Sequence, residues 1–355
     1  MKIVNIFNHY VSIVHLIDII ILLFIIIVMK ICFLDSNPID YNANDLHSNK
    51  IRGAETALIN LANNLQKLGH NIFVFNNTSS KININGVEWN NLKTISTNHS
   101  FDISVSNNDI RLFDLVSSNK KIAISHSIQT IEKFIRKKQL LAYLKHRPII
   151  GLLGKYHDNN RNFFLKMFGV LPLEWGVDDI YIQSDISNKN IDKNKCIFTS
   201  MKDRNLEFLL NVWIEKIIKK RSGSKLYVTP VNRDLKKFNI FNRNFGTKEN
   251  LMIDIASSRL CLIPGHKAEL FCIAAEEAKE LCVPIVSMGI GSLSERISNG
   301  KTGLIASNEK QFADFTIELM NNDALWNSMR NYMLEIRGSK EWSKIAKKFI
   351  SELIT

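Results

Sequence analysis

The chain has 355 residues, of which 45% are hydrophobic and 23% are charged, a composition that excludes disordered and collagen-like proteins. This length suits two domains better than one core, and no internal repeat points to a solenoid. Lysine and arginine number 46 against 34 acidic residues, so the formal net charge of +12 favours anionic partners. Because the sequence has no zinc-finger spacing, RRM-like aromatic motif or long basic block, we expect no nucleic acid among those partners.

The cysteines and histidines bear on metals and on the cell compartment. The five cysteines are odd in number, form no CxxC pair and lie among apolar neighbours, which predicts reduced, mostly buried thiols in a cytoplasmic protein. The nine histidines are scattered, without an HExxH motif or a Cys/His cluster. We therefore predict neither a structural metal nor a cofactor.

The amino-terminal segment, residues 1–28, stands apart because of its hydrophobicity. Ile19–Val28 is an unbroken apolar run, and Val11–Phe33 is mostly apolar with Asp18 inside it. A membrane span needs about 20 apolar residues, and a charge at its centre costs roughly 2.5–3.5 kcal/mol. The segment is thus either a membrane anchor, which would attach the protein to the cytoplasmic face, or an accessory start before a working domain that begins at Met29.

Beyond this segment, short apolar strands alternate with helical patterns. Strand–helix–strand units with short links imply right-handed crossovers and a parallel sheet. The first series predicts strands at Ile31–Leu34, Asn71–Phe75, Asp102–Val105 and Lys121–Ile124, and a helix at Ala54–Leu68. The second predicts strands at Cys196–Thr199, Leu226–Thr229, Leu260–Ile263 and Pro284–Ser287, and helices at Leu206–Lys219 and Ala274–Leu281.

Between the two series lies Leu173–Asn190, which is polar and lacks apolar periodicity. We therefore predict an α/β fold of two doubly wound Rossmann-like domains, at residues 29–185 and 186–335, that face each other across a cleft. At the end of the chain, Trp342–Leu353 carries its apolar residues on one face. We expect residues 336–355 to form a terminal helix that packs back on the protein.

Two glutamates and a glycine-rich turn are the strongest chemical signals. Glu269 lies in a loop after a strand, and Glu277 lies eight residues further on, inside a helix. Carboxylates accept paired hydrogen bonds from the vicinal hydroxyls of a ribose or a hexose. The free N–H groups of the helix start and of the Gly289–Ser292 turn suit a diphosphate. Alone, such a pair of glutamates is also compatible with a solvated surface helix.

The order of these elements resembles the carboxy-terminal half of the retaining GT-B glycosyltransferases of family 4, the glycosyl transferases group 1. The matching residues are Glu269, Glu277-Ala278, Val283-Pro284-Ile285-Val286, Gly291, Glu295 and Thr302-Gly303, with Cys282 where the family usually has glycine. Further similar elements are Gly53-Ala54-Glu55, Gly69-His70, Trp175-Gly176-Val177-Asp178 and Ser200–Leu210.

This resemblance implies a site for a nucleoside diphosphate sugar. Glu277 would bind the donor ribose and Glu269 a hydroxyl of the donor sugar. Arg204 would hold the diphosphate, and Lys202 would replace the family's first arginine, near whose place Met201 stands. The remaining candidates for the donor site are Gly53, Gly291, Ser292 and Glu295.

His126 follows the predicted strand Lys121–Ile124, and a histidine at this place in the family often faces the donor sugar. A structural role is the alternative for a lone histidine after a strand. We expect His126 and Glu269 to be the residues closest to the chemistry.

One predicted helix, within residues 131–147, is both basic and amphipathic. Such a helix can lie on an anionic bilayer, or it can pack on a core with its charged face in water. Its basic residues are Lys133, Arg136, Lys137, Lys138, Lys145 and Arg147.

The resemblance therefore implies retaining transfer of a hexose-like sugar, without a metal, to a glycan or lipid-linked glycan of a surface polysaccharide or lipopolysaccharide. Two alternatives keep the fold: a nucleotide-sugar epimerase or hydrolase, and a non-catalytic nucleotide- or glycan-binding subunit. A membrane surface is a further expected partner.

Overall fold

The computed structural model describes residues 28–48, 50–96, 99–186, 190–243 and 246–354. The expectations for the amino-terminal segment therefore lie outside the described residues, except for Val28. Within the described part of the chain, no helix is both long enough and apolar enough to cross a membrane.

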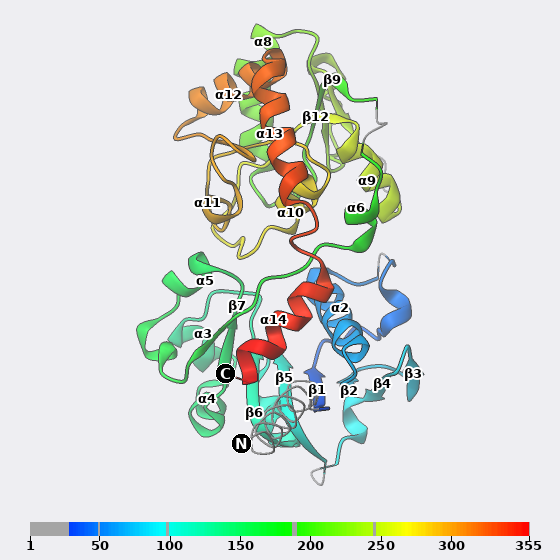
Figure 1. Ribbon diagram of the computed structural model, residues 1–355. Helices are drawn as coiled ribbons and strands as arrows, with labels where there is room; N and C mark the ends of the chain where they lie inside the picture. The colour runs from blue at the N-terminus through cyan, green and yellow to red at the C-terminus, as the bar shows by residue number, and fades with distance from the viewer. Residues whose placement is uncertain (1–27, 49, 97–98, 187–189, 244–245, 355) are drawn as a thin grey trace, which may run out of the picture.

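Two separate sheets organise the structure, one in each half of Figure 1. The first has eight strands in the order β3-β4-β2-β1-β5-β6-β7-β8, and β3 alone is antiparallel to its neighbour. The central strand β1 is buried along almost its whole length, as expected for a parallel strand covered on both faces. Its strands are β1 (Lys30–Asp35), β2 (Asn71–Asn76), β3 (Ile82–Ile84), β4 (Val87–Asn91), β5 (Ser100–Asn107), β6 (Ser117–Ile124), β7 (Ile149–Leu152) and β8 (Val170–Pro172).

The second sheet is entirely parallel, with six strands in the order β11-β10-β9-β12-β13-β14. Its strands are β9 (Asp192–Ile197), β10 (Lys225–Val228), β11 (Ile240–Asn242), β12 (Ser258–Leu262), β13 (Ile285–Ser287) and β14 (Gly303–Ile305). The doubly wound α/β architecture predicted from the sequence is confirmed for both halves.

Helices and helical turns connect the strands of each sheet. In the first half these are η1 (Ala43–Asp45), α2 (Gly53–Lys67), η2 (Leu92–Thr94), η3 (Ile110–Leu115), α3 (Ile131–Arg136), α4 (Leu140–His146), α5 (Lys155–Asn159) and η4 (Phe163–Lys166). In the second they are α6 (Asp179–Gln183), α7 (Leu206–Val212), η5 (Trp213–Ile217), α8 (Ile218–Lys220), η6 (Lys236–Phe238), α9 (Lys248–Ala256), α10 (Ile273–Glu280), α11 (Leu293–Arg296), α12 (Glu309–Asn321) and α13 (Asp323–Ile336).

The chain crosses between the halves twice. On the first crossing, Trp175 still belongs to the hydrophobic core of the first half, and Val177 already belongs to the core of the second. This point lies ahead of the boundary at residue 185 that the sequence suggests. After α13 the chain returns, and α14 (Trp342–Ile354) lies across α2 in the lower half of Figure 1. The two crossings touch where the Val177 amide donates to the Lys340 carbonyl at 2.9 Å.

The basic segment at 131–147 differs from the single helix that its apolar spacing predicts. It forms two short helices, α3 and α4, because Lys138 adopts a left-handed conformation with φ of 54°. Five free cysteines are all buried, as predicted: Cys32, Cys196, Cys261, Cys272 and Cys282.

Candidate functional site

A cavity of about 470 Å³ lies between the two halves and is lined by residues from both. It opens at the carboxyl ends of the strands, because His126 follows β6, Arg204 follows β9 and Glu269 follows β12. Five of the nine predicted site residues line it: Gly53, His126, Arg204, Glu269 and Glu277. The structure therefore brings together candidates that lie up to 224 positions apart in the sequence.

Glu269 lies in the loop between β12 and α10, mostly buried, with Arg204 as its cationic neighbour. The Arg204 Nε lies 3.5 Å from the Glu269 Oε2. Burial raises the pKa of the Glu269 carboxyl, and the positive charge of Arg204 opposes that rise. A polar ligand in the cavity would find here one carboxylate and one guanidinium side by side.

Gly291 and Ser292 support this loop from behind and do not line the cavity. The Ser292 amide donates to the Glu269 carbonyl at 3.0 Å. Gly291 has φ of 74°, and a Cβ added there would lie 2.3 Å from the His266 carbonyl oxygen. The glycine at this position is thus explained by the close approach of two backbone segments, rather than by room for an anion.

Glu277 projects from α10 into the cavity. Burial raises its pKa to about 7, although Lys248 and Tyr181 favour its ionised form. Lys248 begins α9, and its Nζ donates to the Asp178 Oδ2 at 3.0 Å and to the Leu46 carbonyl at 2.9 Å. Lys248 therefore links the first half, through Leu46, to the first crossing, through Asp178, and its charge acts on Glu277.

Arg204 also lies close to two further groups, the Asp203 Oδ2 at 3.1 Å and the His266 Nδ1 at 3.5 Å. Its loop is fixed to the Glu269 side by a hydrogen bond from the Asn205 side-chain Nδ2 to the Gly265 carbonyl. Lys202 is exposed and does not line the cavity, and neither does Met201. Among the described residues, the lysines and arginines on the cavity wall are Arg52, Arg204 and Lys248.

His126 is held in a fixed orientation by a chain of hydrogen bonds. The Asn107 Nδ2 donates to the Asp35 Oδ2 at 3.0 Å, so its amide oxygen is left to accept from the His126 Nε2 at 2.9 Å. The ring stacks on Trp175, with centroids 5.7 Å apart and planes 19° apart. Burial lowers the pKa of His126 to about 4, so the ring is neutral near pH 7 and its Nδ1 can accept a hydrogen bond.

Gly53 is the first residue of α2 and lines the cavity from the first half, whereas Glu277 lines it from the second. A Cβ added to Gly53 would meet no atom within 4 Å, so the glycine leaves open space there. The first turn of α2 is capped by the Glu55 carboxylate, which accepts from the Arg52 amide at 2.9 Å.

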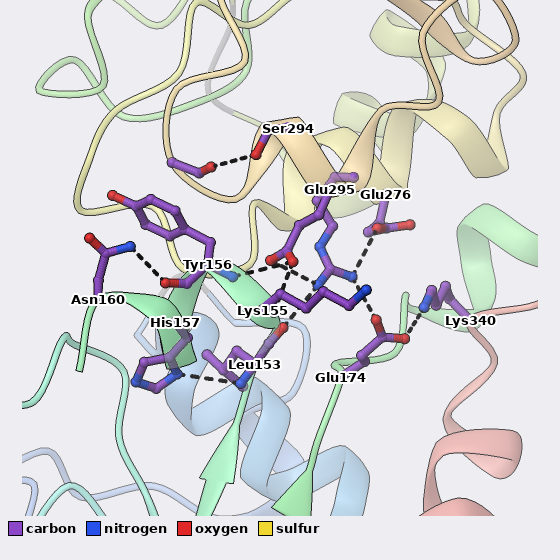
Figure 2. Close-up of polar contacts among 12 residues, drawn as sticks. Leu153, Lys155, Tyr156, His157, Asn160, Glu174, Glu276, Ser294, Glu295 and Lys340 are labelled. Carbon is purple, nitrogen blue, oxygen red and sulfur yellow. Dashed lines mark hydrogen bonds and ion pairs between the residues drawn. The ribbon is translucent and has the colours of Figure 1, made fainter. Parts of the chain in front are cut away.

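Glu295 lies away from the cavity, in the polar network of Figure 2. Its Oε2 accepts from the amides of Lys155, at 2.8 Å, and Tyr156, at 3.3 Å, at the start of α5 in the other half. Next to it, Arg296 pairs with Glu174 at 3.0 Å. The structure thus places Glu295 where it joins the two halves, whereas the sequence suggests a donor contact.

Lys248, Arg52 and Trp175 are site residues that the sequence reasoning did not select. Trp175 and Trp342, from the two crossings, both line the cavity with ring centroids 5.9 Å apart. Trp175 lies in the Trp175–Asp178 element that resembles the family, and this element could have indicated a place at the cavity. Lys248 follows a threonine helix cap and belongs to no such element.

Comparisons with known proteins identify a family domain in the second half and the fold of the chain. Residues 236–335 match the family Glycosyl transferases group 1, and no curated protein matches the chain. Three similar solved structures show the same fold at low identity.

HepE from Anabaena, in complex with UDP, has a TM-score of 0.67 at 13% identity, over 92% of this chain and all of HepE. Sucrose-phosphate synthase from Thermosynechococcus elongatus has a TM-score of 0.64 at 11% identity, over 92% of this chain and 98% of that one. WaaG, a glycosyltransferase involved in lipopolysaccharide biosynthesis, has a TM-score of 0.60 at 12% identity, over 92% and 99% of the two chains. Residues 236–335 therefore carry a glycosyl transferases group 1 domain, and the chain has the GT-B fold, as the sequence suggested.

Proposed function

We propose that this glycosyltransferase moves a sugar from a nucleoside diphosphate sugar to a hydroxyl acceptor, with retention of configuration at the anomeric carbon. The observation that carries the proposal is the convergence of Glu269, Glu277 and Arg204 on one cavity between the two sheets. Two carboxylates suit the hydroxyls of two sugar rings, and a guanidinium suits the diphosphate between them.

In this proposal Glu277 accepts hydrogen bonds from the ribose and Glu269 from a hydroxyl of the transferred sugar. Arg204 stabilises the charge that develops on the departing diphosphate. Lys248 is the second cation at the cavity, in place of Lys202, which is exposed and does not line it. These cations take the role that a metal ion plays in other transferases, so we propose a metal-independent reaction.

The neutral His126 is proposed to position the donor sugar by accepting a hydrogen bond from a sugar hydroxyl at Nδ1. A proton shuttle is disfavoured because its pKa of about 4 leaves almost no protonated ring near pH 7. Retention would follow from departure and attack on the same face of the sugar, with closure of the two halves excluding water.

The proposal extends to the donor and the acceptor of the reaction. HepE was solved with UDP-glucose, and WaaG acts in lipopolysaccharide biosynthesis. We propose a UDP-hexose as the first donor to test, and a growing surface glycan on a lipid carrier as the acceptor. A cytoplasmic site of action is consistent with the five buried free cysteines.

Calorimetry tests the donor site directly. UDP, GDP, ADP and their sugars are titrated into the full chain and into Glu277→Ala, with the exposed Glu335→Ala as a matched control. We expect one nucleotide to bind with micromolar affinity, and its affinity to fall at least about tenfold in Glu277→Ala alone, the loss of a charge-assisted hydrogen bond.

The same samples separate the alternatives. A changed sugar still attached to the nucleotide would indicate an epimerase, and free sugar as the sole product in the presence of acceptor would indicate a hydrolase. Binding without any turnover would favour a non-catalytic subunit, for which the unmatched Met201 is the sequence observation. Full activity in EDTA is expected, and loss of activity would contradict metal independence.

A further inference from the structure

One surface of the first half is unusual in both apolarity and charge. Among the described residues, seven of the fourteen large hydrophobic side chains that are exposed lie within 36 consecutive positions. Leu141 is 81% exposed, Phe163 79% and Phe164 64%. The whole set is Ile135, Leu141, Leu144, Phe163, Phe164, Met167 and Val170. Scattered single apolar residues are normal on a surface, but a gathered set usually marks an interaction site.

The elements that carry these side chains are packed on one another. The Phe134 ring of α3 meets Tyr143 of α4 at 5.5 Å, and Tyr143 meets Phe168, just after η4, at 4.9 Å. The Asn162 amide before η4 donates to the Gln129 carbonyl before α3 at 3.1 Å. In Figure 1, α3 and α4 lie together at one edge of the lower half. We call the exposed face of α3, α4 and η4 the α3–α4–η4 surface.

Positive charge is concentrated in the same stretch. Residues 131–170 hold nine lysines and arginines against two acids, a net charge of +7 out of +12 for the chain. No acidic group among the described residues lies within 4 Å of the side-chain nitrogens of Arg136, Lys137, Lys138 or Arg147. Burial, together with the like charges of Lys137 and Arg136, lowers the pKa of Lys133 to about 8.

We propose that the α3–α4–η4 surface docks on the face of an anionic lipid bilayer. Exposed aromatic and aliphatic side chains would enter the interfacial region, while the surrounding lysines and arginines bind the acidic headgroups. An acidic protein would satisfy the charges, but the two adjacent exposed phenylalanines on a short turn, 6.0 Å apart, favour insertion among lipids. The loop of His126 leads directly into the first turn of α3. That this surface brings a lipid-anchored acceptor toward the cavity rests on the proposed function.

Vesicle cosedimentation of the full chain tests the surface. Phe163→Ser/Phe164→Ser is compared with Ile253→Ser/Leu334→Ser, which removes two exposed apolar side chains from the second half. Both keep residues 1–28, so any contribution of that segment is common to the two. On phosphatidylcholine vesicles that contain phosphatidylglycerol, we expect the first variant to partition about tenfold more weakly than the control. Equal partitioning of the two variants would overturn the proposal.

A second readout locates the contact. Because the five native cysteines are buried, a cysteine introduced as Phe164→Cys can be labelled with an environment-sensitive fluorophore, with Leu334→Cys as control. The label at position 164 should shift to the blue on anionic vesicles and much less on pure phosphatidylcholine, whereas the label at 334 should not respond. A response at both positions, or at neither, would contradict docking through this surface, as would binding to acidic proteins without binding to vesicles.

Discussion

At the scale of single residues, the site depends on two carboxyls whose pKa values are raised by burial. Glu277 has a pKa of about 7 and Glu269 is shifted in the same direction. The two glutamates were predicted from the sequence because their spacing and following strand form an ordered motif. The cations were predicted less well: Arg204 lines the cavity, Lys202 does not, and Lys248 reaches it only because α9 packs beside α10.

The raised pKa of Glu277 predicts a pH-dependent stability. A carboxyl with a folded pKa of about 7, above its ordinary value of 4.5, binds its proton more tightly in the folded state, so stability is lost as the pH rises between these values. Glu277→Gln should therefore raise the free energy of unfolding at pH 8 by roughly 3 kcal/mol, and change it little at pH 4. Urea titrations at both pH values measure this, with Glu335→Gln as the control. An equal effect at the two pH values would contradict the assignment.

At the scale of elements, the apolar runs of the central strands made them predictable, whereas β3, β11 and β14 have three residues each and show no periodicity. The break between α3 and α4 was also invisible, because it depends on a left-handed lysine inside an amphipathic pattern. The sequence suggests a donor contact for the turn before α11; in the structure Gly291 packs against the Glu269 loop, a close approach of two backbones that no sequence pattern reveals.

Gly291→Ala tests that support. Its positive φ and a Cβ only 2.3 Å from the His266 carbonyl require the Glu269 loop to move. We expect a loss of about 1–3 kcal/mol in unfolding free energy and weaker binding of the donor nucleotide. Gly223→Ala, where a Cβ would meet nothing within 4 Å, is the control. Unchanged donor affinity in Gly291→Ala would show that the loop position is independent of the turn.

At the scale of the whole molecule, a buried charge network holds the two halves in register (Figure 2). Arg296, only 4% exposed in its side chain, pairs with Glu174 of the first crossing and lies 3.7 Å from Glu276, and it donates to the Leu153 carbonyl at 2.9 Å. Lys340 of the second crossing also pairs with Glu174. Such a network joins five segments that are distant in the sequence, which is why single-sequence patterns did not reveal it.

Removal of Arg296 should leave Glu174 with Lys340 alone and the buried Glu276 with Lys279 alone, and deprive the Leu153 carbonyl of its donor. Arg296→Met is expected to lower the unfolding free energy by about 3–5 kcal/mol. The exposed pair of Arg233 and Glu207 offers a comparison, and Arg233→Met should cost less than about 1 kcal/mol. Denaturant titration of both variants checks the difference. Similar losses in the two variants would mean that the network contributes no more than a surface pair.

The central claim is retaining transfer from a nucleoside diphosphate sugar bound by Glu277. The most direct measurement follows the anomeric proton by NMR while the full chain consumes the donor that calorimetry selects, in parallel with Glu277→Ala. We expect the product to appear first with the anomeric configuration of the donor, and to form much more slowly with the variant. Product of the opposite configuration, or equal rates in the two proteins, would contradict it.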